Sequence, residues 1–409
     1  MATFTSPPFS NTQVNNKLVK YTQDINREFC RENTFSPYMG EEMTSVIRVR
    51  NELKSGGDTM NLPLVTRLQT GIIGSTSTVI SGSQTLVGSE EVIEQYGMRV
   101  KVDWARNAVV QTKAQAQMDS ADIFGEAKPL LSDWGRELQR DEIIQALMAL
   151  PTDPITAPAD VRVNGILYQS ATTGNRDTWN SDNSDRVLYG SKLANYNATH
   201  ATALKNVLTT DTFTGKNLSL LKRVAMIANP RIRPIRTRNG YEYFVCFAGQ
   251  KAFRDLKNDL NYTATSGGGP NLLSRSREDT GPYGAPDNPL FQDGDQLYDG
   301  VIVRQVPEIS LFAANVWTTL TTAGAGGTTA GTGSAPVEPV FFCGQQAAAL
   351  CWGQMIRPTF RKEDDYGFIN GVGVEGCWGV AKIAKKHPSS GTKMVQFGMA
   401  TAFFSTGAD

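Results

Sequence analysis

The chain has 409 residues, a length that allows two or three domains and a large buried core. Forty lysine and arginine residues balance forty aspartate and glutamate residues, which argues against a basic surface for nucleic acid and against an acidic binding tail. The five cysteines are scattered without C-x-x-C spacing, so we expect reduced, buried thiols in a protein that folds in the cytosol. No signal-peptide pattern is present, and no apolar run approaches the roughly 20 residues that cross a bilayer, so neither secretion nor a membrane partner is predicted.

The N-terminal part combines a polar segment with an amphipathic one. Residues 1–34 are rich in Asn, Thr and Ser, and we expect an arm that packs on another surface. In residues 35–58 apolar side chains have helical spacing, and a Gly-Gly pair provides a stop. The pattern predicts a short helix in this second segment.

Two segments then alternate between apolar and polar residues, as in a half-buried strand. They are SGGDTMNLPLVTRLQ (55–69) and YGMRVKVDWARNAVVQ (96–111), and the polar, glycine-rich residues 71–97 lie between them. We therefore expect a long antiparallel ribbon, with Pro63 at an edge or a bulge. Since two strands cannot bury a face by themselves, this ribbon must lie on another surface.

Residues 119–151 contain the longest predicted helix. Their apolar side chains fall close to a 3.6-residue stripe, Asp119 or Ser120 can cap the start, and Pro151 ends it. Pro129 either kinks this helix or marks a restart, because proline removes a backbone donor. The segment carries seven acidic residues against three basic ones, which favours a solvated or partner-facing surface.

The remaining sequence alternates between loops and short regular elements. We expect helices near residues 191–208 and 250–260, and loops over 266–289 and 321–336. We expect strands at 241–249 and 299–310, and a strand running into a helix over 339–354. The segments GCWGVAKIAK (376–385) and TKMVQFGMATAFFST (392–406) are predicted to form an antiparallel pair. Together these elements indicate an α+β fold.

Candidate catalytic and metal-binding residues are few. The two histidines, His200 and His387, lack HxxxH and HExxH spacing, and we expect both at the surface. No G-x-S-x-G nucleophile motif is present, so nucleophilic catalysis is poorly supported. The acidic pairs Glu90-Glu91 and Asp364-Asp365 favour solvated ion pairs, and a divalent ion there stays open as an alternative.

One glycine pattern imitates a cofactor motif. Residues 371–376 read GVGVEG and match G-x-G-x-x-G. A polar segment precedes them where a dinucleotide site needs a strand, and a strand-like segment follows where such a site needs a helix. The sequence therefore predicts no cofactor, no metal and no catalytic residue, and the protein is expected not to be an enzyme.

Several blocks, in this order along the chain, resemble the coat proteins of the phage N-four group, which have the major capsid protein fold of the Hong Kong 97 type. The blocks are GGDTMNLPLVTRLQ (56–69), FVCFAGQKAFRDLKND (244–259), NPLFQDGDQLYDGVIVRQVPEI (288–309), PVFFCGQQAAALCWG (339–353), DDYGFINGVGVEGCWGVAK (364–382) and MVQFGMATAFFST (394–406). Many relatives carry His-Pro where this chain has Ala248-Gly249.

The resemblance implies a division of the chain. It implies an N-terminal arm (1–34), a peripheral-domain segment (35–55), an extended β-hairpin loop (56–113), the spine helix (114–154), an axial domain (155–336) and a peripheral β region (337–409). The extended loop would lie on the neighbouring subunit. The interface residues implied on it are Thr59, Leu62, Leu64, Arg67, Arg99, Lys101, Trp104 and Arg106.

The function implied is that of a major capsid protein, which assembles with itself into the hexamers and pentamers of an icosahedral head around the double-stranded DNA of a tailed bacteriophage. Scaffold, portal and cement proteins are further implied partners, with DNA contacted non-specifically and assembly taking place in the host cytoplasm. Two alternatives stay open: a nanocompartment shell protein or other virion component of the same fold, and a soluble hydrolase or dehydrogenase.

Overall fold

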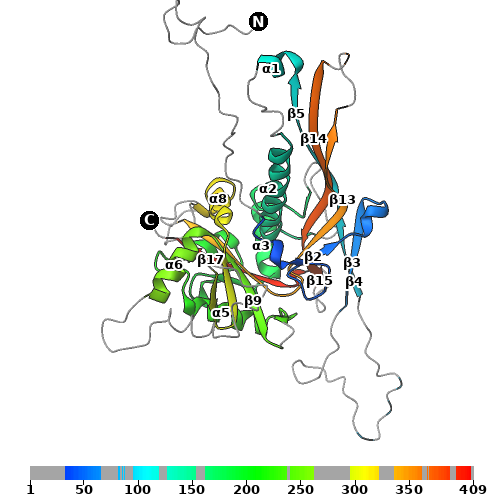
Figure 1. The fold of residues 1–409 in the computed structure, drawn as a ribbon. Helices are drawn as coiled ribbons and strands as arrows, with labels where there is room; N and C mark the ends of the chain where they lie inside the picture. Colours follow the sequence, from blue (N-terminus) through cyan, green and yellow to red (C-terminus); the bar gives the residue numbers. More distant parts are fainter. Residues whose placement is uncertain are drawn as a thin grey trace, which may run out of the picture. The chain divides into compact units, whose positions relative to one another are not determined.

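The computed structural model describes most of the chain outside its N-terminal segment and several loops. The described residues are 33–65, 82, 85, 87, 95–118, 127–152, 162–236, 240–261, 295–321, 336–361, 366, 368–386 and 393–406. Backbone contacts divide the chain, whose helices and strands are labelled in Figure 1, into two units. In the described part, unit 1 consists of Arg106–Glu137 and Ile356–Glu375, and unit 2 of Asn33–Ala105, Leu138–Met355 and Gly376–Asp409.

Unit 2 is built around a seven-stranded mixed sheet with the order β10-β11-β9-β12-β17-β7 and with β8 beside β9. The strands are β7 (Val187–Tyr189), β8 (Ile235–Arg236), β9 (Glu242–Ala248), β10 (Gln296–Tyr298), β11 (Val301–Gln305), β12 (Val337–Cys343) and β17 (Met399–Ser405). All seven residues of β12 and of β17 are buried, as expected for strands that are covered on both faces. The sheet thus joins strands from both sides of the predicted domain boundary at residue 336.

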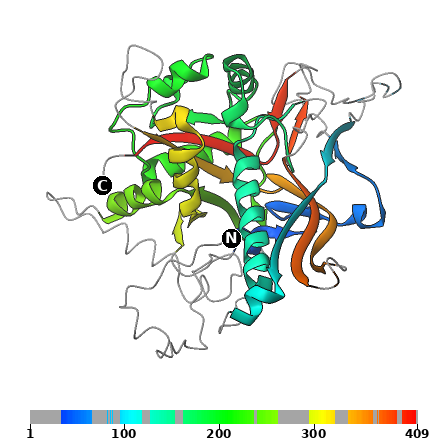
Figure 2. The same ribbon diagram turned by 90° about the horizontal axis from the view of Figure 1, so that it is seen from above.

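Helices cover this sheet. They are α3 (Thr173–Asp182), α4 (His200–Lys205), α5 (Gly215–Ile227), α6 (Gln250–Asn261), α8 (Pro307–Asn315) and α9 (Thr318–Thr321), with 3-10 turns η4 (Tyr168–Ser170) and η5 (Leu193–Asn195). One face packs its aliphatic side chains and Phe342 against Leu218, Leu221 and Phe253 of α5 and α6. On the other face Phe341 contacts Trp317, which follows α8 in the chain. Helix α8 is drawn in yellow in Figure 2.

A six-stranded sheet has the order β1-β2-β13-β14-β5, with β6 beside β14. Its strands are β1 (Met39–Gly40), β2 (Ile47–Arg50), β5 (Asp103–Thr112), β6 (Val163–Asn164), β13 (Ala348–Phe360) and β14 (Ile369–Lys382), and 3-10 turns η2 (Ser36–Tyr38) and η3 (Glu52–Ser55) flank β1 and β2. Strands β5, β13 and β14 each contribute one segment to each unit. Two separate pairs complete the strands: β3 (Thr59–Val65) with β4 (Gln95–Lys101), and β15 (Ala384–Lys386) with β16 (Met394–Gln396).

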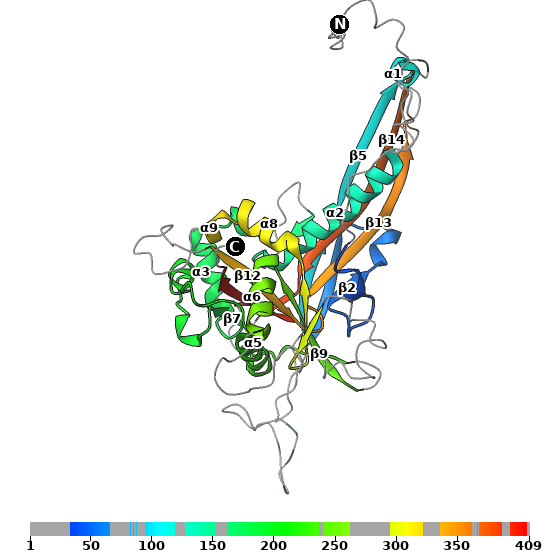
Figure 3. The ribbon, with the colours of Figure 1, turned by 60° about the vertical axis from the view of Figure 1, so that its left-hand side comes forward.

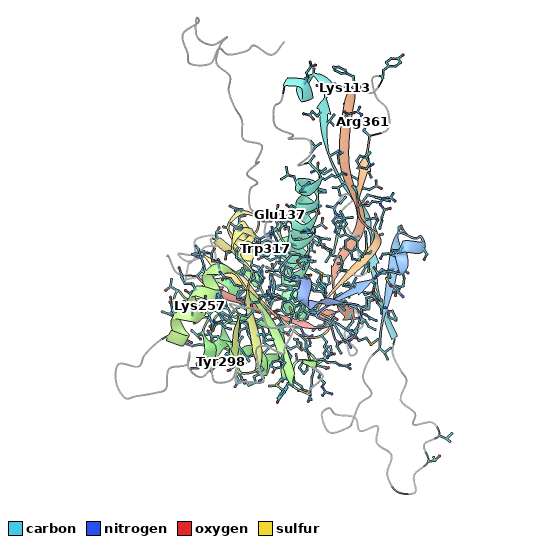
Figure 4. All side chains as sticks on the ribbon, in the orientation of Figure 1. Lys113, Glu137, Lys257, Tyr298, Trp317 and Arg361 are labelled. Carbon is cyan, nitrogen blue, oxygen red and sulfur yellow. The ribbon has the colours of Figure 1, made fainter. Side chains whose placement is uncertain are left out.

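In unit 1 the first half of helix α2 (Ala127–Met148) packs on one face of β13 and β14, and α1 (Lys113–Met118) follows β5 (Figure 3). Leu131 and Trp134 contact Ile356, Val372 and Val374. Gly135 permits this close approach, because a Cβ atom there would lie 3.1 Å from Ile356. Figure 4 labels Lys113 and Arg361 near the end of this sheet, where β5 and β13 end.

Three predicted elements are confirmed. Strand β9 and helix α6 lie where the sequence placed them, at 241–249 and 250–260. Helix α2 covers the second part of the long predicted helix, and Pro129 is its third residue, so Pro129 lies in the first turn, where a missing N–H costs no helical hydrogen bond. The first part, residues 119–126, lies outside the described residues, as do residues 1–32 and the loops predicted at 266–289 and, apart from its ends, 321–336.

Three helix or strand predictions near the sheets are wrong. Residues 35–58 form η2, β1, β2 and η3 in place of a helix, because Ile47–Arg50 pair in parallel with Ala348–Cys351 of β13. The second half of 339–354 is therefore a strand as well, although its alanine run favours helix. The strand predicted over 299–310 ends at Gln305, because Pro307 at the first helical position starts α8.

Two further predictions are corrected in extent. The helix near 191–208 is limited to η5 and α4. Among the described residues, the two C-terminal segments pair as strands with one another through β15 and β16, over Ala384↔Gln396 to Lys386↔Met394. Their main strands, β14 and β17, belong to different sheets.

Candidate subunit interface

The predicted ribbon is present as the antiparallel pair β3–β4, which we call the hairpin. Its register runs from Thr59↔Lys101 to Val65↔Gln95. The return strand is shorter than predicted, because β5 leaves the hairpin after Lys101 and joins β14. The buried side chain of Asn164 fixes this departure: it accepts from the Lys101 N–H at 2.9 Å and donates to the Lys101 carbonyl at 2.9 Å.

The inner face of the hairpin packs on its own subunit. Leu62 and Leu64 are buried together with Met98 and Val100, against residues of β13 and β14 such as Cys351. The prediction that Leu62 and Leu64 contact a neighbouring subunit is therefore corrected. Their alternation signals burial, and the surface that buries them belongs to the same chain.

The outer face of the hairpin is exposed. Thr59, Arg99 and Lys101 all lie on exposed positions, and the register places Thr59 opposite Lys101. At the end of β3, Val65 exposes 53% of its surface. The structure thus brings three of the predicted interface residues together on one accessible face. Arg67 lies outside the described residues.

The other two predicted interface residues lie on β5. Trp104, in unit 2, is 50% exposed, while its backbone is held on both sides: its N–H donates to Asp103 Oδ1 at 2.7 Å, and its carbonyl accepts from Arg162 at 3.2 Å. Arg106 is exposed and belongs to unit 1. The indole of Trp104 is therefore available for contact, whereas its backbone is already paired.

Exposed apolar side chains in unit 1 were missed by the sequence analysis. They are Val109, Val110, Leu130, Phe360, Tyr366 and Phe368. The signal that could have found them is the sequence NAVVQT of β5, where two adjacent valines must point to opposite sides of a strand. If one face of the strand packs on another layer, one of the two valines must point away from that layer.

His200 is buried, which corrects its prediction as a surface residue. It is 2% exposed and is packed among Tyr168, Tyr189, Trp179 and Phe403. A histidine in a polar sequence context gives no sign of such burial, because the aromatic side chains that enclose it come from distant segments. His387 lies outside the described residues.

The hydrogen bonds of His200 determine its tautomer. The Tyr189 hydroxyl donates to Asn180 Oδ1 at 2.8 Å, so it accepts from His200 Nδ1, 2.7 Å away. His200 Nε2 then carries no proton and accepts from the Tyr168 hydroxyl at 2.9 Å. Burial, aided by the charge of Arg176, lowers the pKa of His200 to about 3. Both ring nitrogens are thus occupied in a neutral, structural network.

The acidic residues of α2 lie in two different environments. Asp133 and Glu137 are partly exposed, as predicted for a solvated surface. Glu142 is buried and accepts from Trp378 Nε1 at 2.6 Å and from Arg162 Nε at 2.7 Å. Its burial raises the pKa of its carboxyl group, opposed by these donors. The C-terminal end of α2 therefore lies in the buried core of unit 2.

The glycine motif at 371–376 lies inside strand β14, as its strand-like sequence context predicted. A Cβ atom on Gly373 would lie 2.9 Å from Thr359 Oγ1 and 3.3 Å from Ala108 Cβ, so this glycine allows close packing between strands. Both acidic pairs considered as ion sites, Glu90-Glu91 and Asp364-Asp365, lie outside the described residues.

Comparison with known proteins decides between the remaining classes. Residues 11–402 match the family described as phage capsid protein. The chain belongs to the phage capsid protein family. As a member it is a structural protein, a major capsid protein that forms the phage head shell. No curated protein sequence matches it, and no helix of the described residues is both long and apolar enough to cross a membrane.

Solved capsid structures resemble this capsid protein over its whole length. A chain of the cyanophage Pam1 capsid asymmetric unit is 32% identical, with complete coverage of both chains and a TM-score of 0.78. The capsid of Ralstonia phage GP4 is 18% identical, with coverage of 98% and 99% and a TM-score of 0.68. The head structure of Helicobacter pylori bacteriophage KHP40 is 13% identical, with complete coverage and a TM-score of 0.60, and shares the fold.

Proposed function

We propose that this capsid protein assembles with itself, through a fold of the Hong Kong 97 type, into the hexamers and pentamers of an icosahedral head that encloses the double-stranded DNA of a tailed bacteriophage. The observation that carries the proposal is the full-length similarity to the Pam1 capsid chain. The relationship to the phage N-four group, assembly in the host cytoplasm, and contacts with scaffold, portal and cement proteins belong to the same proposal.

In this proposal α2 is the spine helix, and unit 2's seven-stranded sheet is the core of the axial domain. That domain then takes β12 and β17 from beyond residue 336, because both strands lie within its sheet. The hairpin and the residues between its strands form the extended loop, which lies on a neighbouring subunit. Thr59, Arg99, Lys101, Trp104 and Arg106 are proposed to contribute to that interface.

The two faces of the hairpin support this division of roles. Its inner face is buried on β13 and β14, so the base of the hairpin has a fixed direction within its own subunit. Its outer face exposes polar and basic side chains together with Val65. A rigid base with an exposed outer face suits contact with another molecule, and a shell needs only many modest interfaces of this kind.

The test replaces residues 65–95 by Asn-Gly, which closes a two-residue turn between the register partners Leu64 and Tyr96. The inner face keeps its core contacts, so we expect the unfolding midpoint of the subunit to stay close to that of the unaltered chain. Electron microscopy should show closed shells for the unaltered chain and none for the variant.

Two results would contradict the proposal. Normal shells from the shortened variant would show that the loop is not needed between subunits. An unaltered chain that stays monomeric at every concentration, with its natural partner proteins present, would exclude self-assembly altogether.

A further inference from the structure

Strand β5 forms one edge of the six-stranded sheet. It has ten residues, and the described residues place no strand on its outer side. Natural edge strands of this length usually carry lysines, prolines or bulges that prevent pairing with another chain. Between Trp104 and Thr112 the only charged residue of β5 is Arg106, and there is no proline.

The pairing with β14 determines which backbone groups face outward. The Lys113 N–H donates to the Phe368 carbonyl at 2.9 Å. Cβ atoms placed on Gly373 and Gly371 would lie 3.1 Å and 3.7 Å from the carbonyl oxygens of Asn107 and Val109. The odd-numbered residues of β5 in unit 1 therefore bond to β14. Because antiparallel strands alternate, the N–H and C=O groups of the even-numbered residues, 106 to 110, point away from the sheet.

The chain already satisfies part of this edge with its own side chains. Near the start of β5, the Trp104 N–H donates to the Asp103 side chain and the Trp104 C=O accepts from Arg162. Further along, the Ala108 N–H donates to Asn107 Oδ1 at 2.9 Å. The Asn107 side chain is exposed, so one rotamer change releases this donor. Among the described residues, the stretch of this edge that no other strand pairs with lies after Ala105 and has Ala108 at its centre.

We propose that this stretch pairs with the same stretch of a second copy, antiparallel and across a two-fold axis at Ala108. The inference rests on the proposed self-assembly. A two-fold contact is self-complementary, so each residue must tolerate its symmetry partner. Ala108 meets itself without crowding, and Arg106 lies opposite Val110 of the second copy.

The side chains favour this register. The two copies of Arg106 are separated by four strand positions, about 13 Å, so like charges are kept apart. Val109 and Val110, which are 40% and 51% exposed, become covered on opposite faces of the joined sheet. Val110 also packs along the stem of the arginine opposite, which is a favourable cross-strand contact. The edge from Arg106 to Val110 has one charged residue and a small residue at its centre. It is therefore complementary to a second copy of itself.

Cysteine cross-linking in assembled particles tests the register. In the paired edge, the two Ala108 Cα atoms lie about 5.5 Å apart, within the range that a disulfide spans. Ala108→Cys particles under mild oxidation should therefore give a covalent dimer on non-reducing gels. The matched control is Gln111→Cys on the same strand, whose two copies lie about 20 Å apart in this register. We expect at least about tenfold more dimer from Ala108→Cys than from Gln111→Cys, since only the first meets disulfide geometry.

The described native cysteines are all buried, so they do not compete in this reaction. If Ala108→Cys assembles poorly, the double variant Arg106→Cys/Val110→Cys makes the same test, because each introduced thiol meets the other one of the second copy. Particles that form without the dimer, or equal dimer from both single variants, would overturn the edge pairing and leave the capsid function intact. If the unaltered chain forms no particles, the self-assembly proposal fails together with this one.

Discussion

The seven-stranded sheet and the unit 1 part of the six-stranded sheet are covered to different extents. In unit 2, β12 and β17 are buried at every position, and helices α5 and α6 pack on the sheet they share with β9. In unit 1, α2 packs on one face of β13 and β14, while five consecutive residues of β5, Arg106–Val110, are exposed. In the part of the chain that the structure describes, the first sheet is covered on both faces at β12 and β17, whereas β5 is an exposed edge strand of the second. Under the proposed function, the exposed residues of unit 1 and of the hairpin are the ones expected to contact other subunits.

The largest expected effect concerns the buried core of unit 2 and comes from acid. The pKa of His200 is about 3 in the folded protein, below the ordinary value of 6.5, so the unfolded chain binds more protons between these values. Stability contributed by neutral His200 is complete above pH 6.5 and is lost as the pH falls to 3. The loss amounts to about 5 kcal/mol, measured by urea unfolding at a series of pH values.

The control for this prediction is His200→Gln, which removes the titrating group. The variant should start from a lower stability at pH 7, because two buried tyrosine hydroxyls each lose one hydrogen-bond partner. Its stability should then fall less steeply between pH 6.5 and pH 3. With only one other histidine in the chain, the difference between the two curves isolates His200. Parallel curves would show that the pKa of His200 is not lowered in the folded protein.

The difference between the units also explains what the sequence could predict. Strand β9, helix α6 and the hairpin follow from local periodicity, because each has one pattern along its whole length. The alanine run of β13 and the Ile47–Arg50 segment were predicted as helix, because short apolar runs fit either period and only their pairing with one another decides. Pairing of segments 300 residues apart leaves no local signal.

The candidate interface shows the same limit. Alternation correctly predicted that Leu62 and Leu64 share a face, yet a pattern cannot say which molecule buries that face. Thr59, Arg99 and Lys101 are exposed on the other face, and their contact with a neighbouring subunit, which the family resemblance implies, stays a prediction. The edge of β5 was not predicted, since strand order is a property of the whole sheet. The burial of His200 was not predicted, because the aromatic residues that enclose it come from several elements.

The second prediction compares the two cores directly. Phe342→Ala removes a fully buried ring from the aliphatic layer of unit 2 and should cost about 4 kcal/mol of unfolding free energy. Trp134→Ala removes a partly buried ring from the contact between α2 and β13 and should cost about 2 kcal/mol, since partly buried side chains leave smaller cavities. Chemical denaturation of both variants measures the difference. Equal losses would mean that unit 1 is as tightly packed as unit 2.

The smallest expected effect on folding is at Val110, where a substitution separates stability from assembly. The side chain is half exposed, so Val110→Lys and Val110→Glu should each change the unfolding free energy by no more than about 0.5 kcal/mol. Only the lysine variant should reduce the particle yield, because residue 110 lies opposite Arg106 of the second copy in the proposed pairing. Lysine places two like charges across the strands and should lower the yield, whereas glutamate pairs with the arginine and should preserve it. Lowering the ionic strength should widen the gap, since exposed charges are screened by salt. If both variants assemble alike at low salt, Arg106 does not face residue 110, and the open edge of unit 1 has a different partner.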